Sequence, residues 1–236
     1  MQPPTITPPT PDPKAPPPRS SISVAFETLP RTLRHGYDNI VPLAIMGMIW
    51  WLGAVLILPL GVVTAGLHRV TQRMSEERVV DWRDMLKGWR GDLGWASRLV
   101  VALVSGFFAL SYVTLFYGIQ PNGIVRYLSL TFLLFTFLWV GVMLVSFAMA
   151  LRQEIPTLRR TLRNSIIMVF ANGPSLVISL GFVIVTSIVL LVLPPLAILI
   201  PSWIALWSEE YVRLLLVRAG YLPPDEIADR VTPRRS

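Results

Sequence analysis

Three ionisable residues in an otherwise apolar C-terminal segment are the strongest candidates for chemistry: Glu209, Glu210 and Arg213. Glu209 precedes Arg213 by four residues, which is the order and spacing of a favourable ion pair on one helical face. Carboxylates in apolar surroundings must face protein, an arginine or the membrane interface. The favoured interpretation is a structural ion pair at the cytoplasmic rim of a membrane. The alternative is a substrate or gating site.

Catalytic and metal-binding motifs are missing from the sequence. There is no cysteine, which excludes disulfides, thiolate metal sites and thiol catalysis. The two histidines, His35 and His68, lack the spacing of a metal site, and we expect His35 to lie at the level of lipid headgroups. No HExxH, GxSxG or glycine-rich phosphate loop is found. The sequence therefore predicts no catalytic residue, no metal site, no cofactor and no enzyme activity.

The composition indicates a membrane protein. Hydrophobic residues make up 53% of the chain and charged residues 15%, whereas soluble domains carry about 25% charged residues. Charge-free runs of roughly 20 residues match the length of a helix that crosses about 30 Å of hydrocarbon. The net charge of +7 lies in the segments between these runs, so we expect the lipid bilayer and not nucleic acid as the partner.

The predicted fold class is all-α, a polytopic transmembrane helical bundle of about five spans with interfacial amphipathic helices. The membrane domain covers residues 21–221, between a disordered proline-rich tail (1–20) and a flexible basic tail (222–236). An interfacial helix is expected over residues 21–39. The predicted spans are 40–67, 99–117, 127–151, 174–193 and 196–216.

The first apolar run, residues 40–67, has two interpretations. It is longer than one straight crossing, and Pro59 with Gly61 predicts a kink or a break. A single span would place the N-terminal tail outside, whereas a turn followed by a half-helix would place it inside. The run is short for two full crossings, so we favour the single span. The side of the tail stays open.

The basic linker over residues 68–98 sets the predicted topology. Its lysines and arginines place it on the cytoplasmic side of the plasma membrane, together with residues 152–163 and the C-terminus. Asp81 as N-cap and Gly91 as stop signal predict a helix of about ten residues between them, lying flat at the headgroups. We favour a plain membrane anchor over a platform for a partner or anionic lipid. The residues of this candidate surface are Trp82, Arg83, Lys87, Trp89 and Arg90.

A short sequence repeat precedes two of the apolar runs. Thr28–Arg34 reads TLPRTLR and Thr157–Arg163 reads TLRRTLR. Duplication would explain the repeat. However, any span that enters from the cytoplasm needs a basic lead-in, so convergence explains it equally well. A true repeat would place Arg31 and Arg34 inside, in favour of the half-helix interpretation of the first run.

Three stretches resemble the YesL-like family of bacterial multi-span membrane proteins of unknown function. They are LPLGVVTAGLHRVTQRM (Leu58–Met74), VVDWRDMLKGWRGDL (Val79–Leu93) and TLRRTLRNSIIMVFANGPSLV (Thr157–Val177). The resemblance implies a five-span plasma membrane protein, sometimes encoded with carbohydrate uptake systems. It implies no established catalytic residues and assigns no site.

Two functions are expected from these features. The first is an accessory or scaffold subunit of a membrane solute transport system, with transporter subunits as partners and with homo-oligomerisation left open. The second is a permease or channel for an uncharged small solute, with a path at helices broken near Pro59, residues 172–174 and Pro201. Because the middle of the apolar spans holds no charged residue, charge-coupled transport is disfavoured. The absence of buried charge and the small number of spans favour the accessory subunit over the permease.

Overall fold

The computed structural model describes residues 20–56, 59–76, 78 and 80–222, and these residues form helices and no strand. The predicted all-α fold class is therefore confirmed. The two predicted tails, residues 1–20 and 222–236, fall outside the described residues except for Ser20 and Leu222. The elements are α1 (Ser21–Asp38), α2 (Ile40–Leu56), α3 (Leu60–Ser75), η1 (Trp82–Leu86), α4 (Trp89–Gly118), α5 (Gly123–Leu151), α6 (Leu158–Ala171), α7 (Gly173–Val192), η2 (Pro194–Leu199) and α8 (Ile200–Arg218).

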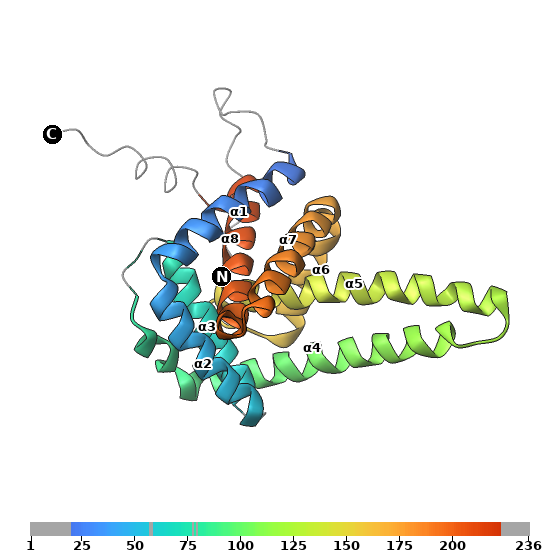
Figure 1. Ribbon diagram of the computed structural model, residues 1–236, viewed down its shortest axis with the longest axis horizontal. Coiled ribbons are helices and arrows are strands. Elements are labelled where there is room, and N and C mark those ends of the chain that lie inside the picture. Colours follow the sequence, from blue (N-terminus) through green and yellow to red (C-terminus); the bar gives the residue numbers. More distant parts are fainter. Residues whose placement is uncertain (1–19, 57–58, 77, 79, 223–236) are drawn as a thin grey trace, which may run out of the picture.

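Helix α8 forms the centre of the bundle (Figure 1). It packs against α1, α2, α3, α5 and α7. Almost every residue from Pro201 to Leu215 is buried, including Leu206 and Trp207. A helix surrounded on all sides presents no separate polar face to water, so its two glutamates must find partners inside the protein.

Three described helices are long and apolar enough to cross a membrane: α4, α5 and α7. A fourth candidate is the pair α1 and α2, which bends by 91° between them. The predicted spans 99–117, 127–151 and 174–193 lie within α4, α5 and α7 apart from one terminal residue. The chain is a helical membrane protein.

The outer halves of α4 and α5 extend away from the bundle as a hairpin (Figure 1). There the two helices contact each other, with the Thr114 and Thr136 hydroxyls 3.2 Å apart and the Tyr117 and Phe132 rings stacked at 5.3 Å. Their other faces expose large apolar side chains such as Leu115, which is 68% exposed. This surface fits lipid chains and would be unfavourable in water.

The single span predicted over residues 40–67 is wrong. Helix α2 ends at Leu56, α3 begins at Leu60, and the indole Nε1 of Trp50 donates a hydrogen bond of 2.9 Å to Thr64 Oγ1. Gly53 also faces Val63, so the two helices pair side by side as a hairpin. Pro59 cannot donate the backbone hydrogen bond that would continue α2, and Gly53 allows a close approach. The turn interpretation is the correct one for the chain path.

The predicted fifth span, 196–216, also differs from the structure. The 3₁₀ helix η2 runs to Leu199 and α8 begins at Ile200, so Pro201 lies in the first turn of a new helix instead of bending an existing one. Proline is well tolerated there because the first backbone N–H groups of a helix have no intrahelical acceptor. Helix α8 is not among the candidate spans of the described chain.

The helices that carry the two halves of the sequence repeat end in a similar way, although the repeat lies inside α1 and at the start of α6. Helices α1 and α6 end at Asn39 and Asn172, and each asparagine side chain donates a 3.0 Å hydrogen bond to the carbonyl four residues earlier. A second helix, α2 or α7, follows directly in both cases. At each helix end the backbone N–H and the side chain of the asparagine both donate to one carbonyl, where the chain changes direction.

The ten-residue helix predicted in the basic linker is wrong. Asp81 caps as expected, because its carboxylate accepts a 3.0 Å hydrogen bond from the Arg83 N–H, but only the 3₁₀ helix η1 follows. Gly88 has a φ of 88°, which ends the segment, and α4 then runs through the predicted stop at Gly91. A left-handed residue interrupts helical hydrogen bonding, and glycine adopts this conformation most easily.

Asp84 fixes η1 to α3, and this gives a pH-dependent prediction. Its carboxylate is bonded by Lys87 and, at 2.9 Å, by Arg73. The Lys87 hydrogen bond, aided by the charges of Lys87 and Arg73, lowers the pKa of Asp84 below its ordinary value of about 4, although burial acts in the opposite direction. Ionised Asp84 therefore stabilises the fold above about pH 4, and this stabilisation is lost as the pH falls through the lowered pKa.

We expect Asp84→Asn to lower the melting temperature at pH 7 and to have no effect at a pH low enough to protonate Asp84. Thermal unfolding of purified wild type and variant at both pH values measures the difference. Asp81→Asn is the matched control, because asparagine caps a helix as well as aspartate does. An equal loss for Asp84→Asn at both pH values would contradict the role of the Asp84 charge.

Candidate functional site: a buried polar cluster beside an apolar cavity

Glu209 is the centre of a buried charge cluster. Its side chain is 0% exposed, and Oε2 accepts a 2.6 Å hydrogen bond from Nη1 of Arg152, the residue that ends α5. Its Oε1 lies 3.1 Å from Nδ1 of His68 on α3. We name His68, Arg152 and Glu209 the polar cluster. It joins three elements and balances the buried carboxylate with a guanidinium.

Glu210 has a separate partner on the other side of α8. Its Oε1 lies 2.7 Å from Nδ1 of His35 on α1, and its Oε2 is buried without a hydrogen-bond partner in the described chain. Arg213 donates a hydrogen bond to the backbone carbonyl of Ser75, the last residue of α3. Both histidines of the chain therefore contact adjacent carboxylates on α8.

The structure places Glu209, Glu210 and Arg213 inside the helical bundle, and their position at the cytoplasmic rim of the membrane stays a prediction. The two glutamates are fully buried and Arg213 is 8% exposed, so all three lie in the protein core. Glu209 forms an ion pair with Arg152, which comes from another part of the chain. Because α8 is surrounded by other helices, partners from α3 and the end of α5 reach the carboxylate directly. His35 contacts Glu210, and its predicted position at headgroup level stays a prediction.

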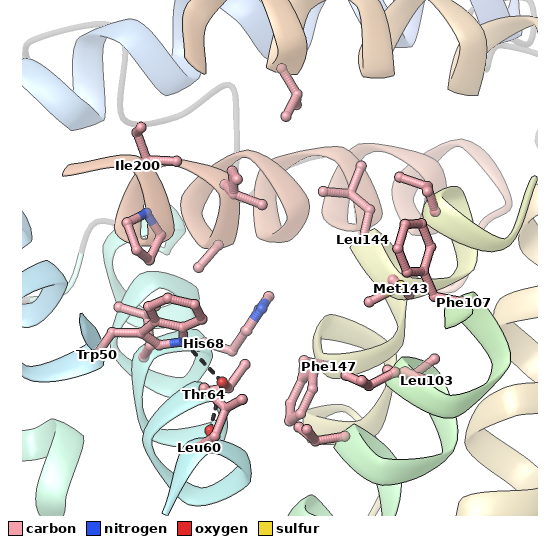
Figure 2. A pocket seen from close by; sticks show the side chains of 18 of the residues that line it. Trp50, Leu60, Thr64, His68, Leu103, Phe107, Met143, Leu144, Phe147 and Ile200 are labelled. Atoms are coloured by element: carbon pink, nitrogen blue, oxygen red, sulfur yellow. Dashed lines mark hydrogen bonds between the residues drawn. The ribbon is translucent and has the colours of Figure 1, made fainter. Parts of the chain in front are cut away.

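An apolar cavity of about 650 Å³ lies against the polar cluster (Figure 2). Figure 2 shows side chains from α3, α4, α5 and α8 pointing into a common space. The lining is mainly aliphatic and aromatic, and His68 is its one ionisable residue. The labelled lining residues are Trp50, Leu60, Thr64, His68, Leu103, Phe107, Met143, Leu144, Phe147 and Ile200.

His68 belongs to both the polar cluster and the cavity lining. Its ring stacks on Phe147 with centroids 5.4 Å apart and an interplanar angle of 17°, while Nδ1 contacts Glu209. The ring is therefore held from two directions. Among the described residues, the second ring nitrogen, Nε2, has no hydrogen-bond partner. The imidazole is 6% exposed, and it projects into the space shown in Figure 2.

The candidate surface in the basic linker is only partly assembled. Arg83, Lys87, Trp89 and Arg90 are exposed, and the Arg83 guanidinium lies over the Trp82 ring at 5.5 Å. Trp82 is on η1 and Trp89 begins α4, with left-handed Gly88 between them. The two tryptophans therefore do not share one helix face, and a role in binding a partner stays a prediction.

Sequence reasoning missed the partners of the two glutamates. His68, Arg152 and His35 are separated from them by 141, 57 and 175 positions. The available signal was general: two adjacent carboxylates in an apolar helix need compensating groups, and His68 and Arg152 each directly follow an apolar run. In the described part of the chain, no group of three or more His, Cys, Asp or Glu residues could hold a metal ion.

Comparisons with family models, curated proteins and solved structures found no match to this chain. The resemblance of Leu58–Met74, Val79–Leu93 and Thr157–Val177 to the YesL-like family therefore stays a prediction from the residues.

Proposed function

We propose that this membrane protein is a permease that holds an uncharged, largely apolar small molecule in the cavity beside His68. The cavity itself carries the proposal: its volume of about 650 Å³ is in the range of small-molecule sites, about 300–1,000 Å³. The Glu209 carboxylate behind His68 is balanced by Arg152. A charged ligand would leave water for an apolar lining without a compensating charge, which is unfavourable.

The fold also supports a proposed topology. If the basic segments 68–98 and 152–163 are cytoplasmic, as the distribution of lysine and arginine favours, the α2–α3 hairpin returns the chain to the side from which it entered. The N-terminus would then lie on the cytoplasmic side with these segments, in the plasma membrane. The cavity, lined by α4, α5 and α7 among others, would be open to molecules dissolved in the bilayer.

Photolabelling in lipid nanodiscs tests the proposed site. The probe is a twelve-carbon alkane that carries a diazirine, and labelled positions are mapped by peptide mass spectrometry. We expect saturable labelling at Leu103, which lines the cavity and is 3% exposed, with unlabelled dodecane as competitor. At Leu115, on the lipid-facing part of the same helix, labelling should rise without saturation.

A cavity-filling variant provides the control for this test. Val104→Phe adds a ring to the cavity lining and should remove the saturable labelling at Leu103 while labelling at Leu115 is unchanged. Labelling of Leu103 that does not saturate, or that is unchanged in Val104→Phe, would contradict the proposed site.

An accessory subunit of a solute transport system is the second candidate. The observation in its favour is the exposed basic surface formed by Arg83, Lys87 and Arg90 next to exposed Trp89. Gentle purification from native membranes through a tag after Ser236 tests it. A transporter subunit recovered in equal amount, and lost from Arg83→Glu/Arg90→Glu, would support this function. Recovery of this chain alone would argue against it.

A further inference from the structure

The polar cluster fixes the hydrogen-bonding state of His68. Glu209 accepts a hydrogen bond from Arg152, and an ionised carboxylate can only accept. The contact between Glu209 Oε1 and His68 Nδ1, at 3.1 Å, is therefore a hydrogen bond that Nδ1 donates. In a neutral imidazole the proton on Nδ1 leaves a lone pair on Nε2, which makes Nε2 an acceptor.

Charged groups on α8 and at the end of α5 surround the contact between His68 and Glu209. Arg152 already balances Glu209, and Glu210 faces away toward His35 on α1. Arg213 contributes a second guanidinium on α8, directed to the Ser75 carbonyl. His68 lies between these charges and the apolar cavity, with its ring stacked on Phe147.

The other polar side chains of the cavity lining already have partners. Trp50 Nε1 donates to Thr64 Oγ1, and the Thr64 hydroxyl donates to the Leu60 carbonyl at 2.7 Å. Trp51 Nε1 donates to the Ala197 carbonyl at 3.4 Å. Among the described side chains that line the cavity, His68 Nε2 is thus the one polar atom without a protein partner.

We infer that the ligand is an uncharged amphiphile with an apolar body and one hydrogen-bond donor, such as a hydroxyl, which donates to His68 Nε2. This inference rests on the proposed function and specifies its ligand class. A hydroxyl that reaches Nε2 gains a hydrogen bond while its chain fills the apolar space. The Phe147 stack and the Glu209 hydrogen bond hold the ring ready for this contact.

Competition against the photolabel at Leu103 tests the inference in the wild-type protein. The competitors are dodecane, dodecan-1-ol and dodecyl methyl ether, each corrected for its partition into the nanodisc. The alcohol should compete roughly 3- to 10-fold more strongly than the alkane, which is the effect of one hydrogen bond. The ether accepts but cannot donate, so it should compete no better than the alkane. Equal competition by alcohol and ether, or by alcohol and alkane, would overturn the inference.

The variant His68→Phe is the second measurement. Phenylalanine keeps a ring beside Phe147 but has no acceptor, so dodecan-1-ol should compete no better than dodecane within this variant. An advantage that persists in this variant would overturn the role of His68. If the variant does not fold, the comparison of the three competitors in the wild-type protein still tests the inference. Absence of any saturable labelling would instead contradict the proposed function, so the two failures are distinguishable.

Discussion

Replacement of Glu209 by alanine is expected to lower the free energy of unfolding by about 3–5 kcal/mol, because removal of one partner from a buried ion pair leaves the other uncompensated. Arg152 would lose its 2.6 Å carboxylate partner and His68 its hydrogen-bond acceptor. Equilibrium unfolding of the purified protein in mixed micelles, with a denaturing detergent as titrant, measures the loss.

Two further variants make this result specific to the buried pair. Glu154→Ala removes an exposed carboxylate two residues from Arg152 and should change the stability by no more than about 0.5 kcal/mol. The double variant Glu209→Gln/Arg152→Gln removes both charges, and it should be more stable than the sum of its single variants predicts. A loss for Glu209→Ala no larger than that for Glu154→Ala would show that the polar cluster contributes little to stability.

The second large effect is expected for Gly66→Ala on α3. A Cβ at this position would lie 2.1 Å from the backbone carbonyl oxygen of Met85. A backbone atom cannot rotate away as a side chain can, so η1 must shift away from α3. We expect a net loss of about 1–3 kcal/mol, even though alanine favours a helix over glycine by about 1 kcal/mol. Equilibrium unfolding in the same mixed micelles measures the change.

Gly181→Ala on α7 is the matched control for this prediction. No atom lies within 4 Å of a Cβ at Gly181, so only the helix preference acts and the variant should be up to about 1 kcal/mol more stable. Opposite signs for the two variants are the expected outcome. A gain in stability for Gly66→Ala would mean that η1 does not press against α3.

The spans that sequence reasoning places well are those whose limits are local. Helices α5 and α7 lie close to the predicted limits because turn signals such as Asn122 and Pro174 stand next to long apolar runs. The hairpin of α2 and α3 is different, because an apolar run of this length suits either one tilted span or two shorter helices. The hydrogen bond between Trp50 and Thr64 shows that the run forms two shorter helices. This hydrogen bond depends on tertiary packing.

The candidate site was only half predictable for a related reason. The spacing of Glu209 and Arg213 suggests a pair within one helix, but side chains from other helices compete for the same carboxylate. Arg152 and His68 reach it because α3 and α5 both pack on α8. Single-sequence periodicity describes one helix at a time, so it cannot reveal which residues from distant helices meet.

The central place of α8 constrains the order in which the protein can assemble during synthesis. Helices α1 to α7 leave the ribosome before α8, yet α1, α2, α3, α5 and α7 all pack against it. Until α8 arrives, His68 and Arg152 lack Glu209, and contacts of such long sequence separation form slowly. The nascent protein therefore passes through a stage in which the surrounding helices lack α8. During this stage their inner faces depend on lipid, on the insertion machinery or on chaperones for protection from aggregation.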